Sequence, residues 1–249
     1  MHDAGFHHLV VVIIADTFQY PSNIMFRSAS RFQSLSALVL APTFACLPCL
    51  AFSEEYPFDT KGFPTKCVNP VPERAWPNAL PLAGVGMRRK NFYVMEVDVY
   101  MTAVNLSPQA LTNVKANNGS SAVEAILKGT KGEIPQPAVT VVLRFVRDVD
   151  SKKVSEAFNE VFAGVAPEKI ANFGKQLSSA VGEKGMKTGE EVMFVWMEGG
   201  GMKFIKNGVV GGGVMDKEIE HKLLGAYLDP VKAVSPELLA CFNANIDKI

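Results

Sequence analysis

The sequence predicts an α+β fold in which a largely antiparallel sheet carries a layer of helices on one face. Residues 91–106 alternate apolar and polar side chains, which is typical of a half-buried strand. Asn207-Gly208 joins two short extended runs and is a strong signal for a two-residue hairpin turn, so antiparallel pairing is expected there. Strands and helices follow one another in groups, unlike the regular alternation of a doubly wound parallel fold.

Four stretches are predicted to be extended. In residues 91–106 the odd positions from 93 to 103 are all apolar, while several even positions carry acids or hydroxyls. Residues 138–147 are rich in β-branched side chains and are expected to form a buried strand. Residues 190–198 form the third predicted strand, and residues 201–213 form the hairpin.

Six segments are predicted to be helical. In the clearest of them, residues 151–163, the apolar side chains recur with a period near 3.6 residues and form one stripe. A Ser-Pro pair marks the start of the first and of the last segment, because Pro is favoured in the first helical turn. The segments cover residues 108–115, 121–128, 151–163, 167–181, 216–228 and 236–247.

The chain divides into three parts. Residues 1–51 are expected to be a targeting leader, residues 52–81 a loop-rich lead-in with many prolines, and residues 82–249 the folded domain. Within the leader, two arginines precede an apolar stretch that ends in small residues, which is the order of a cleavable signal peptide. Met25 is a candidate for the true start, with the residues ahead of it an extension of the gene model.

The leader predicts delivery to an organelle. Its Ala51-Phe52 junction resembles the bipartite plastid leaders of algae with secondary plastids, so a plastid is favoured. Three acids follow closely, which is untypical of such leaders and keeps the secretory pathway and the mitochondrion open. No stable membrane span is expected, because two prolines interrupt the longer apolar run and the run over residues 9–15 is too short.

Charge and residue types narrow the possible functions. The 25 Lys and Arg residues are balanced by 25 Asp and Glu, so no basic surplus points to a nucleic acid. His221 is the only histidine after Met25 and has no paired ligands near it, so neither a metal site nor a cofactor is expected. No serine lies in a nucleophile elbow. The glycine runs 199–201 and 211–213 lack the spacing of a phosphate loop and are expected to be turns and bulges.

A cluster of three cations, Arg88, Arg89 and Lys90, precedes the alternating strand. One interpretation is a solvated strand entrance. The other is that one arginine turns inward and binds an anion, since its planar guanidinium can donate two parallel hydrogen bonds to a carboxylate. Arg88 and Tyr100 would be about 40 Å apart in a fully extended chain. They can meet only if the chain turns between them, and Asn91 is the expected bend.

Three stretches of the sequence resemble the chalcone isomerase fold family. They are GVGMRRKNFYVMEVDVYMTAVNL at 84–106, VVLRFVRDVDSKKVSEAFNEVF at 141–162 and LLGAYLDPVKAVSPELL at 223–239. The resemblance extends from about Phe63 to Ile246 and implies an open-faced sandwich of sheet and helices. The family holds true chalcone isomerases, fatty-acid-binding plastid proteins and relatives of other or unassigned function.

The resemblance also implies which residues line a site. Arg88 matches the arginine that guides the reacting phenolate in the true enzymes, and Tyr100 stands where those enzymes have a threonine. The enzymes' Tyr and Asn of the central helix fall on about Ser151 and Phe158, and their Thr-Met pair falls on residues 226–227. Most of the enzymatic set is therefore replaced. What remains, Arg88 with Tyr100, resembles the carboxylate clamp of the fatty-acid-binding members.

We therefore expect a non-catalytic binder of fatty acids or similar apolar anions, in a cleft between sheet and helices. The expected ligand-binding residues are Arg88, Tyr100, Thr102 and Tyr227, and no residue is assigned a catalytic role. The alternative is a chalcone isomerase, an intramolecular lyase that closes a flavanone-type ring, with Arg88 stabilising the phenolate. A third possibility is an accessory protein with an empty core. The expected partner is a small apolar carboxylate or phenolic molecule, and a monomer is expected.

Overall fold

The computed structural model describes residues 56–249 except 69, 72–78, 93–94, 118–120 and 129–134. These residues belong to one compact unit, Ser53–Ile249. The predicted leader, residues 1–51, lies outside the described residues.

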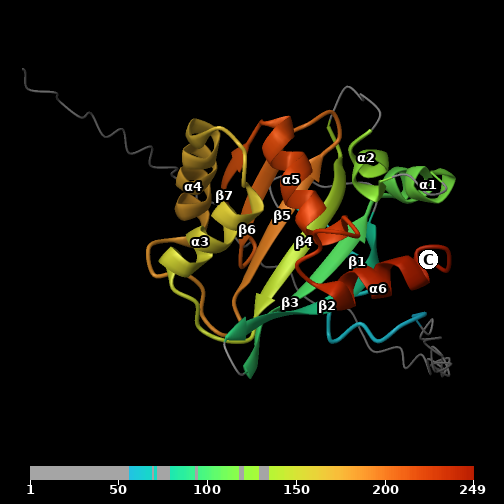
Figure 1. Ribbon diagram of the computed structural model, residues 1–249. Helices are drawn as coiled ribbons and strands as arrows, with labels where there is room; N and C mark the ends of the chain where they lie inside the picture. Colours follow the sequence, from blue (N-terminus) through green and yellow to red (C-terminus); the bar gives the residue numbers. More distant parts are fainter. Residues whose placement is uncertain (1–55, 69, 72–78, 93–94, 118–120, 129–134) are drawn as a thin grey trace, which may run out of the picture. The chain divides into compact units, whose positions relative to one another are not determined.

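A seven-stranded antiparallel sheet forms the framework, and its strands lie in the order of the sequence (Figure 1). Each strand pairs with the next one along the chain, which confirms the predicted fold class. The strands are β1 (Lys66–Cys67), β2 (Leu80–Phe92), β3 (Met95–Leu106), β4 (Pro137–Phe145), β5 (Glu191–Met197), β6 (Met202–Lys206) and β7 (Val209–Val214).

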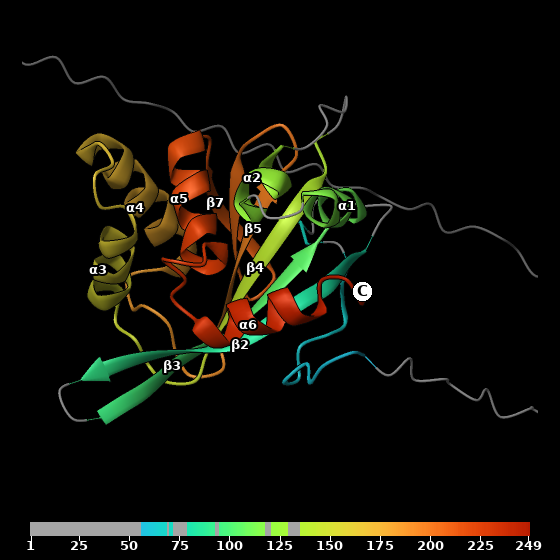
Figure 2. The same cartoon turned by 45° about the vertical axis from the view of Figure 1, so that its right-hand side comes forward.

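Six helices in the described residues pack on one face of the sheet. Helices α3 to α6 lie in front of the strands in Figure 1, and α1 and α2 pack at the end of the sheet beside α5, as the turned view in Figure 2 also shows. The helices are α1 (Pro108–Ala116), α2 (Ala122–Leu127), α3 (Ser151–Val161), α4 (Pro167–Val181), α5 (Lys217–Leu228) and α6 (Pro236–Asn245). None of these helices has the length and apolar character that a bilayer span needs.

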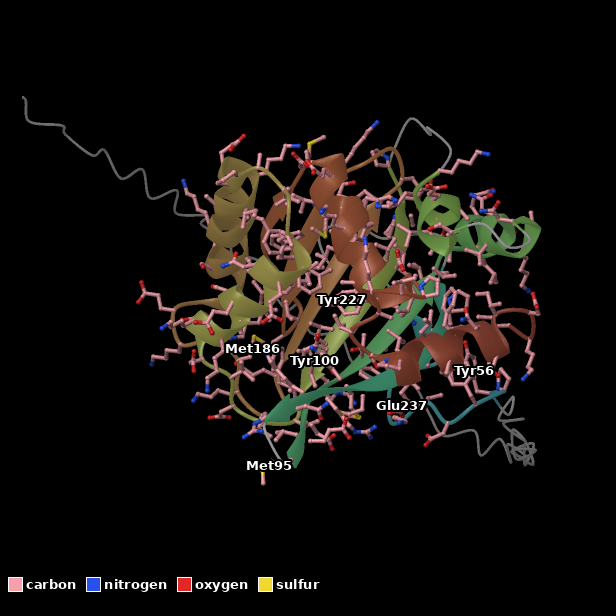
Figure 3. All side chains as sticks on the ribbon, viewed as in Figure 1. Tyr56, Met95, Tyr100, Met186, Tyr227 and Glu237 are labelled. Carbon is pink, nitrogen blue, oxygen red and sulfur yellow. The ribbon has the colours of Figure 1, made fainter. Side chains whose placement is uncertain are left out.

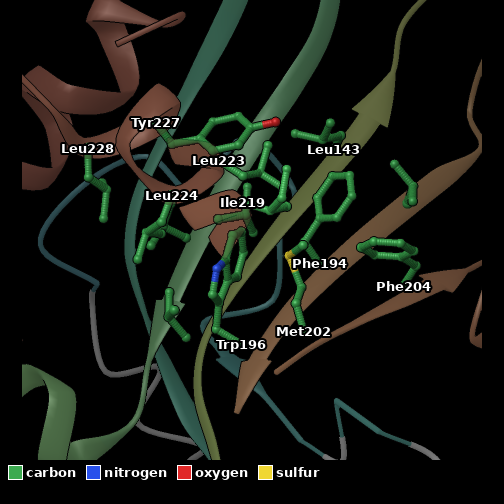
Figure 4. Close-up of a cluster of buried hydrophobic side chains, with 14 of the residues drawn as sticks. Leu143, Phe194, Trp196, Met202, Phe204, Ile219, Leu223, Leu224, Tyr227 and Leu228 are labelled. Carbon is green, nitrogen blue, oxygen red and sulfur yellow. The ribbon is translucent and has the colours of Figure 1, made fainter. Parts of the chain in front are cut away.

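The main core fills the space between the helices and the sheet. Figure 4 shows Trp196 and Phe194 of β5 packed against Ile219 and Leu223 of α5, and all four side chains are fully buried. The Trp196 indole N–H donates to the Glu220 backbone carbonyl at 3.0 Å, which satisfies the polar atom of this large side chain. This core fixes α5 on the sheet.

The second face of the sheet is covered by the lead-in. Phe63 is 5% exposed and the Arg144 guanidinium lies 4.2 Å from the centre of its ring. Val71 is fully buried against β5 and β6, and the Tyr56 hydroxyl donates to the Leu82 carbonyl. The lead-in also contains β1 and the first two residues of β2, and it supplies core residues.

The cation cluster lies within a strand rather than ahead of one. Arg88, Arg89 and Lys90 belong to β2, which forms a hairpin with β3. Asn91 is not a bend, because it pairs with Glu96 in the ladder and the chain turns after Phe92. The hairpin nevertheless brings Arg88 opposite Tyr100, as the expected turn required.

The glycines of β2 and β7 allow helices to approach the sheet closely. A Cβ atom at Gly86 would lie 2.1 Å from the Leu238 backbone nitrogen in α6. A Cβ atom at Gly211 would lie 2.3 Å from the Ala180 Cα in α4, and the register of β6 and β7 leaves Gly211 as the extra residue of a β-bulge, as expected for this glycine run. The Asn207-Gly208 turn is confirmed, with φ values of 48° and 82° that suit a type I′ hairpin.

Candidate ligand-binding cleft

A cleft of about 950 Å³ lies between the sheet and helices α3 and α5. Its floor includes Val97, Phe145 and Val192 from three strands, and its roof includes Val154 and Phe158 from α3. Charged side chains stand around the rim. The volume and the apolar walls are those of a typical site for a small organic molecule.

A β-bulge in β3 determines which side chains face this cleft. Arg88 pairs with Tyr100 but the next residue, Arg89, pairs with Asp98, so Val99 is an extra residue on β3. As a result the neighbours Val99 and Tyr100 both line the cleft. On the hairpin side of the bulge the odd positions face the cleft, and beyond Tyr100 the odd positions face the lead-in.

Arg88 stands at the β2 end of the cleft. One of its guanidinium nitrogens, Nη1, donates to the Val234 carbonyl at 2.8 Å and to the Arg89 carbonyl at 2.8 Å. The Val234 carbonyl is held close because Ser235, which caps α6, donates its hydroxyl to the Met87 carbonyl at 2.9 Å. Within the described part of the chain, Arg88 has no carboxylate partner.

Unlike Arg88, Arg89 and Lys90 each have a carboxylate partner among the described residues, and the side chain of each is 43% exposed. Arg89 points away from the cleft and forms an ion pair with Asp98 at 2.9 Å. Lys90 lines the rim of the cleft and lies 3.5 Å from the Glu160 carboxylate of α3. Lys90 is thus partly solvated, and its ammonium also lies within ion-pair distance of the helix that covers the cleft.

Two tyrosines complete this end of the cleft (Figure 3). Tyr227 of α5 is 2% exposed, and its phenol is close enough to that of Tyr100 for each to shift the pKa of the other. Tyr100 also contacts the Arg88 guanidinium, and its ring packs on Phe145 with 5.5 Å between the ring centres. Burial raises the pKa of Tyr100 and raises that of Tyr227 still further, so both phenols stay protonated at neutral pH.

Comparison with known proteins gives the family. A sequence model described as chalcone isomerase-like matches residues 74–235. The chain belongs to the chalcone isomerase-like family. The crystal structure of a fatty-acid binding protein from Arabidopsis thaliana is similar, with a TM-score of 0.55 and 16% sequence identity over 73% of this chain and 97% of that chain. At this identity the likeness shows the fold alone. No curated protein sequence matches the chain.

Family resemblance matches Ser151, Phe158 and Ala226 to catalytic positions of true chalcone isomerases, but these residues offer few reactive groups to the cleft. Phe158 and Ala226 line the cleft but have no group that can exchange a proton. Ser151 forms the first residue of α3 and does not line the cleft. Arg88, Tyr100 and Tyr227 do carry polar groups in the lining, which also includes Lys90, Asp229 and Lys232.

Thr102 does not lie where the sequence suggested. It is fully buried and is not part of the cleft lining. Its neighbour in the ladder, Gly86, is in contact with Leu238, so the start of α6 covers this part of the chalcone isomerase-like sheet. The Thr102 hydroxyl has no hydrogen-bond partner among the described residues.

The opposite end of the cleft was not found from the sequence. Met186 is 1% exposed, lines the cleft and pairs with Val149 through two backbone hydrogen bonds of 2.8 Å. A single apolar residue inside the polar stretch 182–191 is the signal that could have identified it.

Among the described residues, no group of three or more His, Cys, Asp or Glu side chains could hold a metal ion.

Proposed function

We propose that this protein binds fatty acids, or similar apolar molecules that end in an anionic group, in the cleft between the sheet and α3. The observation that carries this proposal is the state of Arg88. Its guanidinium stands in the wall of an apolar cleft and contacts two backbone carbonyls and Tyr100, while no described carboxylate neutralises it. A partly buried charge is stabilised by an opposite charge, so an anionic head group is the favoured occupant.

The hydrogen-bonding groups at this end support the same proposal. Arginine offers donors only, and a protonated tyrosine can offer one donor to a ligand. A carboxylate has two oxygens and no proton, so it can accept from both Arg88 and Tyr100. Charge-assisted hydrogen bonds are stronger than neutral ones, at roughly 1.5–3 kcal/mol each. The apolar walls formed by β3, β4 and α3 would then surround the tail.

The isomerase alternative receives no comparable support from the site. Proton-transfer and positioning groups each contribute about 10² to 10⁴ in rate, and the positions that match them by family resemblance carry Phe158 and Ala226. Incubation with a 2′-hydroxychalcone separates the two functions. We expect ring closure close to the uncatalysed rate, and saturable turnover far above that rate would replace the binding proposal by the isomerase.

Titration of the full chain with one fluorescent fatty acid tests the proposal. Arg88→Ala is expected to weaken binding at least tenfold, since about 1.4 kcal/mol corresponds to a factor of ten. Tyr100→Phe removes one neutral donor and should cost about 1 kcal/mol. Arg89→Ala is the matched control, because this neighbour has the same charge but faces away from the cleft and pairs with Asp98. Equal losses in the Arg88 and Arg89 variants would reduce the effect to diffuse surface charge and refute the site.

A further inference from the structure

The cleft ends in a buried apolar wall on the side away from Arg88. Met186 lies in the loop between α4 and β5, and in Figure 3 it lies on the α3 side of Tyr100, whereas Tyr227 lies on the α5 side. Four lining residues at this end are each 5% exposed or less: Leu177 and Val181 of α4, Met186, and Val192 of β5. We call these four residues the end wall. All four belong to the main core, so packed side chains lie behind them.

The backbone at Met186 is held by three sets of contacts. Its two hydrogen bonds with Val149 join the loop to the segment that leads into α3. Gly185 has a φ of 76°, and a Cβ atom there would lie 2.3 Å from the Val149 carbonyl oxygen, so the loop lies directly against this segment. The Lys206 ammonium of β6 donates to the Val181 carbonyl at 2.9 Å and to the Gly185 carbonyl at 3.4 Å. The fold therefore fixes the position of this loop, and the Met186 side chain determines where the cleft ends.

The span of the cleft limits the tail that fits inside it. Arg88 belongs to β2 and Val192 to β5, so the cleft crosses three strand intervals, or about 14 Å at about 4.8 Å per interval. An extended alkyl chain of about ten to twelve carbons covers this distance, since its zigzag C–C bonds are about 1.5 Å long. A longer tail either meets the end wall or turns back toward the solvated mouth.

We infer that Met186 sets the upper limit of tail length and is therefore a specificity-determining residue. This inference rests on the proposed function and extends it from the head group to the tail. Methionine is long and unbranched, and its side chain has three heavy atoms beyond Cβ. Replacement by alanine removes these atoms, and a fixed backbone cannot collapse fully into the space that they leave. This space is about as long as two or three methylene groups.

Calorimetric titration of the full chain with saturated fatty acids from octanoate to stearate, each kept below its micelle concentration, tests this role. Each further buried methylene should strengthen binding about fourfold until the tail fills the cleft, and the affinity then stops rising. We call the tail length at this point the length limit. Met186→Ala should move the length limit up by about two or three carbons. It should bind tails of that length about tenfold more tightly than the unmodified protein does.

Three control variants separate a length limit from a general loss of packing. Met186→Leu conserves the volume and should leave the length limit within about one carbon. Val154→Ala removes apolar atoms from α3 along the side of the cleft, so it should weaken the binding of all tails alike without moving the limit. Val192→Met lengthens a side chain of the same end wall and should move the limit down by about one or two carbons. Because Val192→Met creates no cavity, it tests the inference even if Met186→Ala does not fold.

The outcomes separate this inference from the proposed function. If fatty acids bind but Met186→Ala and Val192→Met leave the length limit unchanged, the inference is refuted and the proposed function stands. A limit that moves equally in Val154→Ala would also refute the inference, because any truncation would then have the same effect.

A parallel series of 1-alkanols tests the tail without an anion. A limit that moves in this series supports the role of Met186, and 1-alkanols that bind as tightly as fatty acids would refute the anionic head group alone. If neither series binds to the unmodified protein, the proposed function and the inference are both refuted.

Discussion

Replacement of Gly86 by alanine is expected to displace α6 and destabilise the protein. The added Cβ atom would lie 2.1 Å from the Leu238 nitrogen and 2.5 Å from its Cα, and both are backbone atoms that cannot rotate away. The helix must therefore move by about 1 Å or more to restore an ordinary contact, and overpacking of this kind costs roughly 1–3 kcal/mol. The same movement would pull the Ser235 hydroxyl from the Met87 carbonyl and the Val234 carbonyl from Arg88.

Gly174→Ala is the matched control for this substitution. Gly174 lies inside α4, and a Cβ atom there would meet nothing within 4 Å. Alanine in a helix interior is more stable than glycine by about 0.5–1 kcal/mol, so this variant should be stabilised. Identical chemistry at the two positions is thus expected to change stability in opposite directions.

The assay is urea denaturation followed by circular dichroism, with thermal unfolding as a second measurement. For a domain of this size 1 kcal/mol shifts the Tm by about 2–4 °C. Gly86→Ala should lower the Tm by about 2–12 °C, and Gly174→Ala should raise it by about 1–4 °C. Gly86→Ala should also weaken fatty-acid binding, because Arg88 loses a support. If Gly86→Ala changed neither the stability of the protein nor its fatty-acid binding, the close packing of α6 on β2 would be refuted.

Two further expectations concern the lead-in. Burial raises the pKa of the Cys67 thiol from 9.0 to about 11, so its contribution to stability is complete below pH 9 and is lost between about pH 9 and 11. Urea denaturation at pH 8 and pH 10 measures how much unfolding free energy is lost as the pH rises. This loss should be smaller in Cys67→Ala than in the unmodified protein, and an equal loss in the two proteins would contradict the assignment to Cys67. A chain that begins at Ser53 should unfold at the Tm of the full chain. A chain that begins at Leu80 lacks Phe63 and should therefore have a lower Tm, because burying a Phe side chain contributes about 1.5–3 kcal/mol. Equal Tm values for the two shortened chains would exclude a core role for the lead-in.

Much of the fold follows from local patterns in the sequence. The helix predicted at 151–163 is α3, Ser151–Val161, and the strand predicted at 138–147 is β4, Pro137–Phe145. The strand β2 was missed because glycines and three consecutive cations conceal its alternation. Gly84 and Gly86 are needed where α6 lies on the strand, and α6 comes some 150 residues later in the sequence. A contact so distant along the chain leaves no periodic signal near the strand itself.

The site was predictable to a similar extent. Family resemblance directed attention to Arg88, Tyr100 and Tyr227, and the fold brings all three to one end of the cleft. Their binding of a ligand stays a prediction. Thr102, two residues after Tyr100 on the same strand, was also expected to bind the ligand. The sequence could not show that α6 covers that position, since the approach of a helix to a sheet depends on the whole fold.

The extra residue at Val99 has a consequence for how charge is distributed on the hairpin. If the pairing of Arg88 with Tyr100 continued without a bulge, Lys90 would pair with Asp98, and both Asp98 and Glu96 would turn onto the cleft face. The cations would then be neutralised by acids of their own hairpin. With the bulge, the acids stay on the outer surface, where Asp98 pairs with Arg89. The two faces of the hairpin therefore differ in charge. On the face toward the cleft, the positive charge of Arg88 is not neutralised by a described acid of the same hairpin.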